Sequence, residues 1–158
     1  MLVVRRLVLL TAILVGLLTT ACVSFPADPE GTLERVTGGV LRVGVSPNPP
    51  HTEVRGSEPE GAEVVLLRDF AATLPAEIEW TVGGEEMLIL ALEHGNLDLV
   101  IGGLTADTPW TKHAAVTKPH AEATDPTGEP VKLVMAARLG ENAFLLRLER
   151  FLLERGSL

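Results

Sequence analysis

The sequence has a single cysteine, Cys22, so no disulfide can form within the chain. It has no run of basic residues, and its formal net charge of −8 makes nucleic-acid binding a poor prediction. It also lacks a Gly-x-Ser-x-Gly motif, a phosphate-binding loop, and a Ser or Cys paired by spacing with a His. These absences argue against catalysis, and we predict that the protein is not an enzyme.

Metal ligands are scarce as well. His113 and His120 stand seven residues apart with no cysteine nearby, which is no convincing set of ligands for a metal ion. We therefore expect neither a metal site nor another cofactor. The length of 158 residues suffices for one α/β domain with its own core but is short for two.

Residues 1–21 have the composition of an export signal. Arg5 and Arg6 precede an apolar run over 7–18, and the small residue Ala21 precedes Cys22. The apolar run is shorter than the roughly 20 residues that a membrane-spanning helix needs. We predict a signal peptide over 1–21, and the alternative is an uncleaved N-terminal anchor.

The rest of the chain alternates strand and helix patterns. Residues 22–39 are predicted to be a tether, because 25–34 is rich in Pro, Asp, Glu and Gly and has no periodicity. Strands are then expected at 40–45, 77–82 and 97–101, with helices at 62–74 and 85–94 between them. A β-α-β-α-β order predicts parallel strands, with ligands bound beyond their carboxyl ends. The loops 46–51 and 102–105 lie at those ends.

The C-terminal part has a different pattern. Short strands are predicted near 114–117 and 131–137, separated by the turn-rich connector 118–130. A helix over 141–155 closes the domain, which we place at 40–153. One face of this helix carries Phe144, Leu145, Leu148, Phe151 and Leu152.

Two resemblances follow from these segments. The sequence LTTAC at 18–22 resembles a bacterial lipobox, in which the cysteine is lipidated, although Thr19 stands where an aliphatic residue is usual. The domain resembles family 3 of the bacterial extracellular solute-binding proteins, the amino-acid-binding components of ABC transporters. The segments that carry this resemblance are LRVGV (41–45), NPP (48–50), GAEVVLL (61–67), ALEHGNLD (91–98), GGLT (102–105) and TKPH (117–120).

The family resemblance implies two lobes joined by two hinge strands, with the solute trapped between them. Here the strands near 114–117 and 131–137 match the hinges, and only the 13 residues 118–130 lie between them. A second lobe cannot fit in that length. The expected fold is therefore an α/β single periplasmic-binding-protein-like lobe, with a mostly parallel sheet flanked by helices.

The resemblance also implies a function. The chain is expected to be a lipid-anchored component of, or derived from, an ABC importer, exported to the periplasm or cell surface. It would bind a small polar solute such as an amino acid, and its expected partners are an ABC permease or a second chain that completes the cleft. The alternatives are a non-catalytic module that docks on a permease or sensor, and a reduced remnant without ligand binding.

The candidate site residues lie on the loops at the strand ends, and each has a plainer structural explanation. Glycines can make a tight turn, a loop histidine can be without a role, and an acidic residue suits the start of a helix. Trp110 stands where relatives carry an arginine that binds the solute's carboxylate, so it could either stack on a solute or fill the space of the missing lobe. The predicted ligand-binding residues are Asn48, Pro50, His51, Glu63, Gly102, Gly103, Leu104, Thr105 and Trp110.

Overall fold

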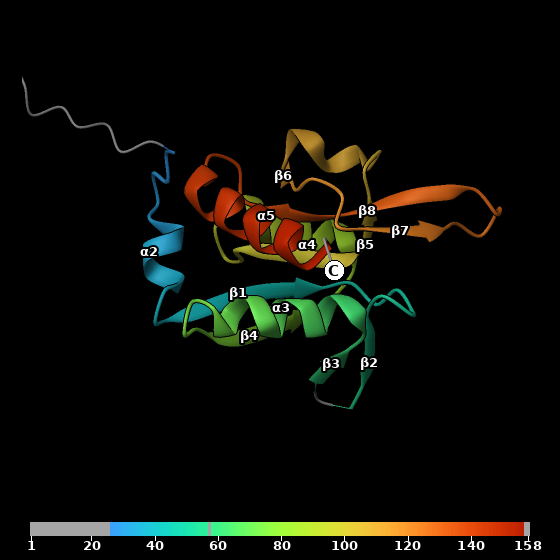
Figure 1. Ribbon diagram of the computed structural model, residues 1–158, viewed down its shortest axis with the longest axis horizontal. Helices are drawn as coiled ribbons and strands as arrows, with labels where there is room; N and C mark the ends of the chain where they lie inside the picture. The colour runs from blue at the N-terminus through green and yellow to red at the C-terminus, as the bar shows by residue number, and fades with distance from the viewer. Residues whose placement is uncertain (1–25, 57, 157–158) are drawn as a thin grey trace, which may run out of the picture.

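The computed structural model describes residues 26–56 and 58–156, so Cys22 and the predicted signal peptide lie outside the described residues. Helices and strands alternate along most of this length (Figure 1). The elements are α2 (Thr32–Val36), β1 (Val40–Val45), β2 (Glu53–Arg55), β3 (Glu58–Glu60), α3 (Ala62–Ala72), β4 (Glu77–Val82), α4 (Glu85–Glu93), β5 (Leu99–Thr105), the 3-10 helix η1 (Pro109–Lys112), β6 (Ala115–Val116), β7 (Ala121–Thr124), β8 (Pro130–Ala137) and α5 (Asn142–Gly156).

One mixed sheet organises the domain. Its strand order is β4-β1-β5-β8-β6, and β7 also pairs with β8. Strand β1 runs parallel to β4 and β5, whereas β8 is antiparallel to β5, β6 and β7. The predicted α/β single lobe is confirmed, but the sheet is mixed rather than mostly parallel. The reason is that β8 follows β7 through a hairpin, which makes neighbouring strands antiparallel, and not through a helical crossover, which would make them parallel.

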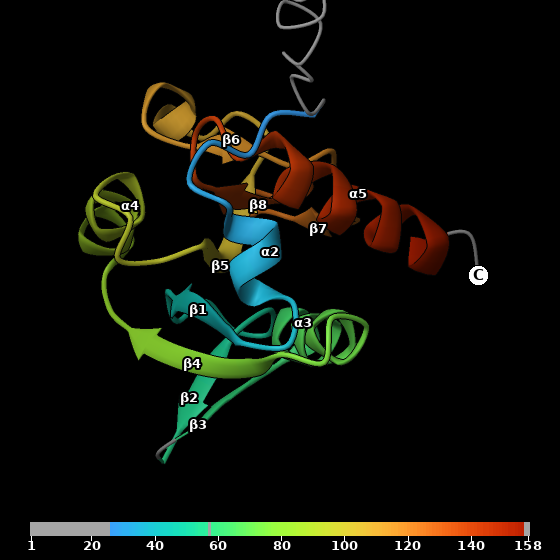
Figure 2. The same cartoon turned by 90° about the vertical axis from the view of Figure 1, so that its left-hand side faces the viewer.

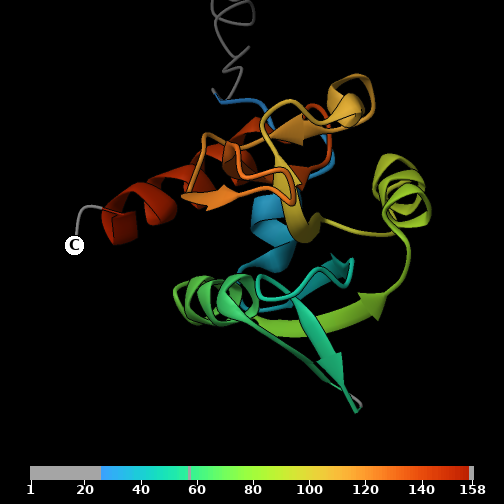
Figure 3. The same cartoon turned by 90° about the vertical axis from the view of Figure 1, so that its right-hand side faces the viewer.

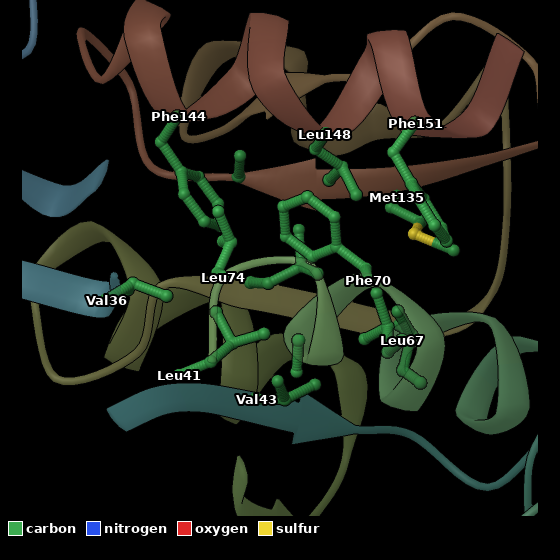
Figure 4. Packing of buried hydrophobic residues seen from close by; sticks show 14 of the residues in the cluster. Val36, Leu41, Val43, Leu67, Phe70, Leu74, Met135, Phe144, Leu148 and Phe151 are labelled. Atoms are coloured by element: carbon green, nitrogen blue, oxygen red, sulfur yellow. The ribbon is translucent and has the colours of Figure 1, made fainter. Parts of the chain in front are cut away.

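Helices cover both faces of the sheet, with α3 and α5 on one side and α4 on the other (Figures 2 and 3). The larger core lies under α3 and α5, where Phe144 packs edge-on against Phe70 with ring centroids 6.0 Å apart (Figure 4). A smaller core lies under α4. The predicted apolar face of the last helix is confirmed, since Phe144, Leu148, Phe151 and Leu152 are buried and Leu145 is partly buried.

The predicted tether is partly folded onto the domain. Helix α2 falls within residues 22–39, and its Val36 is fully buried in the larger core. The buried Glu141 carboxylate accepts hydrogen bonds of 3.1 Å from the backbone N–H groups of Glu30 and Thr32. These bonds hold residues 30–32 against the start of α5. The sequence did not predict this contact, because the 25–34 segment has no periodicity.

Three other segments differ from the sequence-based expectation. Between the 46–51 loop and α3, where no strand was predicted, the chain forms a two-stranded hairpin, β2–β3. Strand β5 continues through residues 102–105, which we expected to form a loop, with a shift in register between Val100 and Leu104. The connector 118–130 contains β7, which pairs with β8 over Ala121–Thr124, and the β7–β8 hairpin projects from the rest of the domain (Figure 1).

Candidate functional site

The loop after β1 lies against the last part of β5. Asn48 donates a hydrogen bond of 2.9 Å from Nδ2 to the carbonyl oxygen of Gly102. Within the loop, the buried Thr52 donates to the carbonyl oxygen of Ser46 and accepts from the backbone N–H of Asn48 at 3.0 Å. Two predicted site segments, 46–51 and 102–105, therefore form one surface at the carboxyl end of the parallel strands.

Glu63 links this surface to the first turn of α3. Its Oε2 atom accepts hydrogen bonds of 3.0 Å from the backbone N–H groups of both Gly102 and Gly103. Only 2% of the residue is exposed, so solvation at a helix start does not explain its presence. Glu63 orders the end of β5, and its carboxylate occupies the two amide donors that this backbone offers.

Gly102 and Gly103 have to be glycines because neighbouring residues lie too close for a Cβ atom, and at Gly103 also because of the backbone conformation. A Cβ on Gly102 would lie 2.6 Å from the Cβ of Ser46. Gly103 has φ 64°, and a Cβ there would lie 2.5 Å from Nδ2 of Asn48. A tight turn alone therefore does not account for them.

A first pocket of about 160 Å³ opens beside Glu63. The Oε1 atom of Glu63 lies 3.2 Å from Nε2 of His120, but the two groups are not aligned for a hydrogen bond. Both His120 ring nitrogens are buried without a hydrogen-bond partner. Glu63 and His120 therefore contact each other within ion-pair distance, and Nδ1 of His120 is the pocket atom left without a partner among the described residues. Its walls are His51, Ala62, Glu63, Leu66, His120, Ala121 and Leu133.

His120 was missing from the predicted site residues. The sequence places it 57 positions after Glu63, beyond the predicted outgoing hinge. It reaches the site because the connector turns back along β8, with the His120 backbone N–H bonded to the carbonyl of Leu133 at 3.0 Å. The only signal in the sequence was its place at the end of the family segment TKPH.

A second pocket of about 370 Å³ lies at the end of β5 and is lined by two carboxylates, Glu85 and Asp107. Thr105 donates a hydrogen bond from its hydroxyl to Oδ1 of Asp107 at 2.5 Å. The Leu104 side chain is buried in the smaller core, although the residue also lines this pocket. The remaining lining residues are Gly103, Leu104, Thr105, Thr108 and Pro109.

Trp110 packs against the smaller core and donates a hydrogen bond from Nε1 to Oε1 of Glu85. The ring is half-buried, which supports a packing role and leaves it outside the lining of either pocket. Pro50 is exposed in the loop after β1 and lines neither pocket. These two predicted residues therefore border the site without forming its walls.

Within residues 26–56 and 58–156, no group of three or more His, Asp or Glu side chains is placed to hold a metal ion. Over the same residues, no helix combines the length and the apolar character that a membrane crossing requires.

Comparison with known proteins shows the family. The model of the bacterial extracellular solute-binding proteins, family 3, matches residues 41–127, which is more than half of the chain. The chain belongs to this family. A relative from Campylobacter jejuni, described as a probable histidine-binding protein, is 30% identical over 115 residues. The match covers 70% of this family 3 chain and 45% of the relative, so the chain spans about half the relative's length.

Solved structures of other binding proteins share the fold of this family 3 lobe. The arginine-bound form of domain 1 from TmArgBP is 26% identical, with a TM-score of 0.67 over 77% of this chain and 97% of that domain. The ancestral amino-acid-binding protein described as a precursor of cyclohexadienyl dehydratase is 15% identical, with a TM-score of 0.68 over 80% of this chain and 94% of the other. The match to domain 1 accords with the single lobe expected from the short connector.

Proposed function

We propose that this protein is a non-catalytic, single-lobe solute-binding component of an ABC importer, exported and anchored by a lipid on Cys22. The surface formed by 46–51, Glu63 and 102–105 binds a small polar solute. The observation that carries this proposal is the pocket beside Glu63, in which a buried carboxylate faces a buried imidazole whose Nδ1 has no hydrogen-bond partner. Buried polar groups without hydrogen-bond partners are rare in native structures, and a polar ligand in the pocket would supply the missing partner.

A single lobe offers only half of the enclosure that two lobes provide. We therefore expect millimolar or weaker binding by the monomer, because a small-molecule site normally buries most of its ligand. The arginine-bound form of domain 1 from TmArgBP supports binding by one lobe without its partner lobe. A permease or a second chain would complete the cleft and tighten the binding.

Isothermal titration calorimetry of the full chain against amino acids, amines and small organic acids tests the binding. We expect at least one of these solutes to bind, and weakly. A micromolar dissociation constant for the monomer would contradict the open-lobe account. No heat from any solute at the highest soluble concentration would contradict solute binding itself.

The lipid anchor has its own test. Cells producing the chain are fed radiolabelled palmitate, and Cys22→Ser is the matched variant because it changes one atom. We expect label in the wild-type chain and none in the variant, together with loss of the variant from the membrane fraction. Equal membrane retention of both chains would indicate that the segment 7–18 is an uncleaved anchor.

A further inference from the structure

We propose that His120 is a specificity-determining residue of the lobe, whose Nδ1 atom accepts a hydrogen bond from a protonated nitrogen of the solute, such as the ammonium group of an amino acid. This inference rests on the proposed solute-binding function and assigns one recognising residue in the pocket beside Glu63. It comes from the contact between the His120 ring and Glu63 and from the charges on the pocket walls.

The backbone of the connector fixes the position of His120. The His120 N–H donates to the carbonyl oxygen of Leu133 at 3.0 Å, and the next residue, Ala121, pairs with Leu133 in the β7–β8 ladder. Only 4% of the His120 side chain is exposed. The imidazole is therefore held through β8, whereas its neighbour Glu63 belongs to the first turn of α3.

Glu63 determines which nitrogen of the ring is free. Its Oε2 atom accepts from the backbone N–H groups of Gly102 and Gly103, and its Oε1 atom lies 3.2 Å from Nε2 of the His120 ring. A carboxylate opposite one ring nitrogen favours the tautomer with the proton on that nitrogen. The neutral ring then offers Nδ1 as an acceptor, and Nδ1 is buried with no partner among residues 26–56 and 58–156.

The charge of the pocket indicates which solute group donates to Nδ1. Glu63 is the acidic residue among the walls, the titratable bases are His51 and His120, and the other walls are apolar. With neutral imidazoles the walls carry one negative charge. A protonated nitrogen would balance that charge, and buried charges are stable when they are paired and hydrogen-bonded. The carboxylate of an amino acid would lie farther from Glu63, because like charges repel.

Protonation of His120 would convert Nδ1 from an acceptor to a donor. Binding of a protonated nitrogen should therefore weaken as the ring gains a proton. Of the surrounding charged groups, Glu63 is the one in direct contact with the ring. His120 also lines a larger pocket of about 470 Å³ beside the end of α5. The titratable and charged groups of the neighbouring elements are Glu63 of α3, His51 of the loop after β1, Glu122 of β7, Lys132 of β8, Lys118 before β7 and Glu149 of α5.

Two substitutions separate the two ring nitrogens. His120→Gln places an amide near the position of Nε2, so it keeps a donor for Glu63 and removes Nδ1. His120→Asn places an amide near the position of Nδ1, so it keeps an acceptor for the solute and removes the donor for Glu63. A role of His120 in stability alone would make His120→Asn the more damaging variant, because only that variant takes the facing donor away from the Glu63 carboxylate.

Arginine is the probe, because its ammonium and guanidinium groups are both protonated nitrogens, and its affinity is measured by amide chemical-shift titration of the full chain. At about pH 7.5 we expect His120→Gln to weaken binding by roughly 10-fold or more and His120→Asn by less than about 3-fold. Glu122→Gln is the matched control, because Glu122 is exposed two residues after His120 and does not line the pocket beside Glu63, and its affinity should stay within about 2-fold. The wild-type affinity should fall between about pH 7.5 and about pH 5.5, and the fall should be smaller in His120→Asn, although His51 is present in both chains. Thermal melting verifies that each variant is folded.

Each outcome has a separate meaning. Equal arginine affinity of the wild type and His120→Gln, or tighter binding at the lower pH, would overturn the inference and leave solute binding intact. Glutarate, which has no N–H group, should distinguish neither chain from the other, and glutarate binding that His120→Gln abolishes would show that Nδ1 donates and would overturn the inference as well. If His120→Gln did not fold, the pH dependence of the wild type and of His120→Asn would still decide between these results. Failure of arginine to bind the wild type would overturn the inference, and failure of every amino acid, amine and organic acid would overturn the proposed function with it.

Discussion

Replacing Glu63 by Ala should destabilise the lobe because it removes the acceptor for two backbone amides. The Gly102 amide is buried, and a buried donor without a partner costs about 1–3 kcal/mol. The Gly103 amide is half-buried, so water can replace part of that bond. Removal of a buried carboxylate returns some desolvation energy. The net loss in the free energy of unfolding should be about 2–4 kcal/mol.

Urea unfolding followed by the fluorescence of Trp80 and Trp110 measures this loss. Glu63→Gln keeps an oxygen acceptor of the same shape and should cost only about 1 kcal/mol. Glu60→Ala is the control, because Glu60 is exposed one residue before the Gly61 that precedes α3, and it should change stability by less than about 0.5 kcal/mol. If Glu63→Ala were no worse than Glu60→Ala, the role assigned to the Glu63 carboxylate in ordering the end of β5 would be refuted.

Three other substitutions test the packing and the electrostatics. Phe144→Ala removes a fully buried ring that packs against Phe70 and should lower the free energy of unfolding by about 3–5 kcal/mol, measured in urea. The control Leu146→Ala, at an exposed position of the same helix, should change it little. Similar losses in the two variants would contradict the docking of α5 on the core. Asp98→Asn should cost about 2–3 kcal/mol, because Asp98 is buried and pairs with both Arg35 and Arg42, and a neutral result would contradict that network. Burial raises the pKa of Asp28, and the neighbouring Glu141 carboxylate raises it further. The contribution of Asp28 to the free energy of unfolding is therefore complete below its unfolded pKa of 3.8. It falls as the pH rises through the higher folded pKa, because the charged form is less favourable in the folded lobe. Asp28→Asn should therefore gain stability relative to the wild type between pH 4 and pH 7, and a pH-independent difference would contradict this linkage.

The sequence predicts best where a local pattern decides the structure. Strand β1, strand β4 and helix α5 were expected because alternation or helical spacing marks the side that is buried. The domain's single-lobe character followed from chain length, since 13 residues cannot form a second lobe between the hinge strands. These features depend on neighbours in sequence or on simple geometry.

Long-range contacts account for what the sequence did not reveal. Helix α2 is held by Glu141, 109 residues away from Thr32, and its own five residues have too little periodicity to be recognised. His120 reaches Glu63 only because β7 folds back along β8. Leu104 was expected at the ligand surface; it lines the second pocket, but its side chain is buried in the smaller core, together with Val100 on the same face of β5. The spacing of residues along one sequence does not show such contacts between distant segments.

A titration of the ¹⁵N-labelled full chain with arginine, followed by backbone amide chemical shifts, tests the central claim, solute binding at the end of β5, most directly. The account predicts that the largest shifts fall on Asn48, His51, Gly103, Thr105 and Asp107, around the carboxyl end of β5. Shifts confined to the β2–β3 hairpin or to α5, or a spectrum unchanged at the highest soluble concentration of arginine, would contradict it.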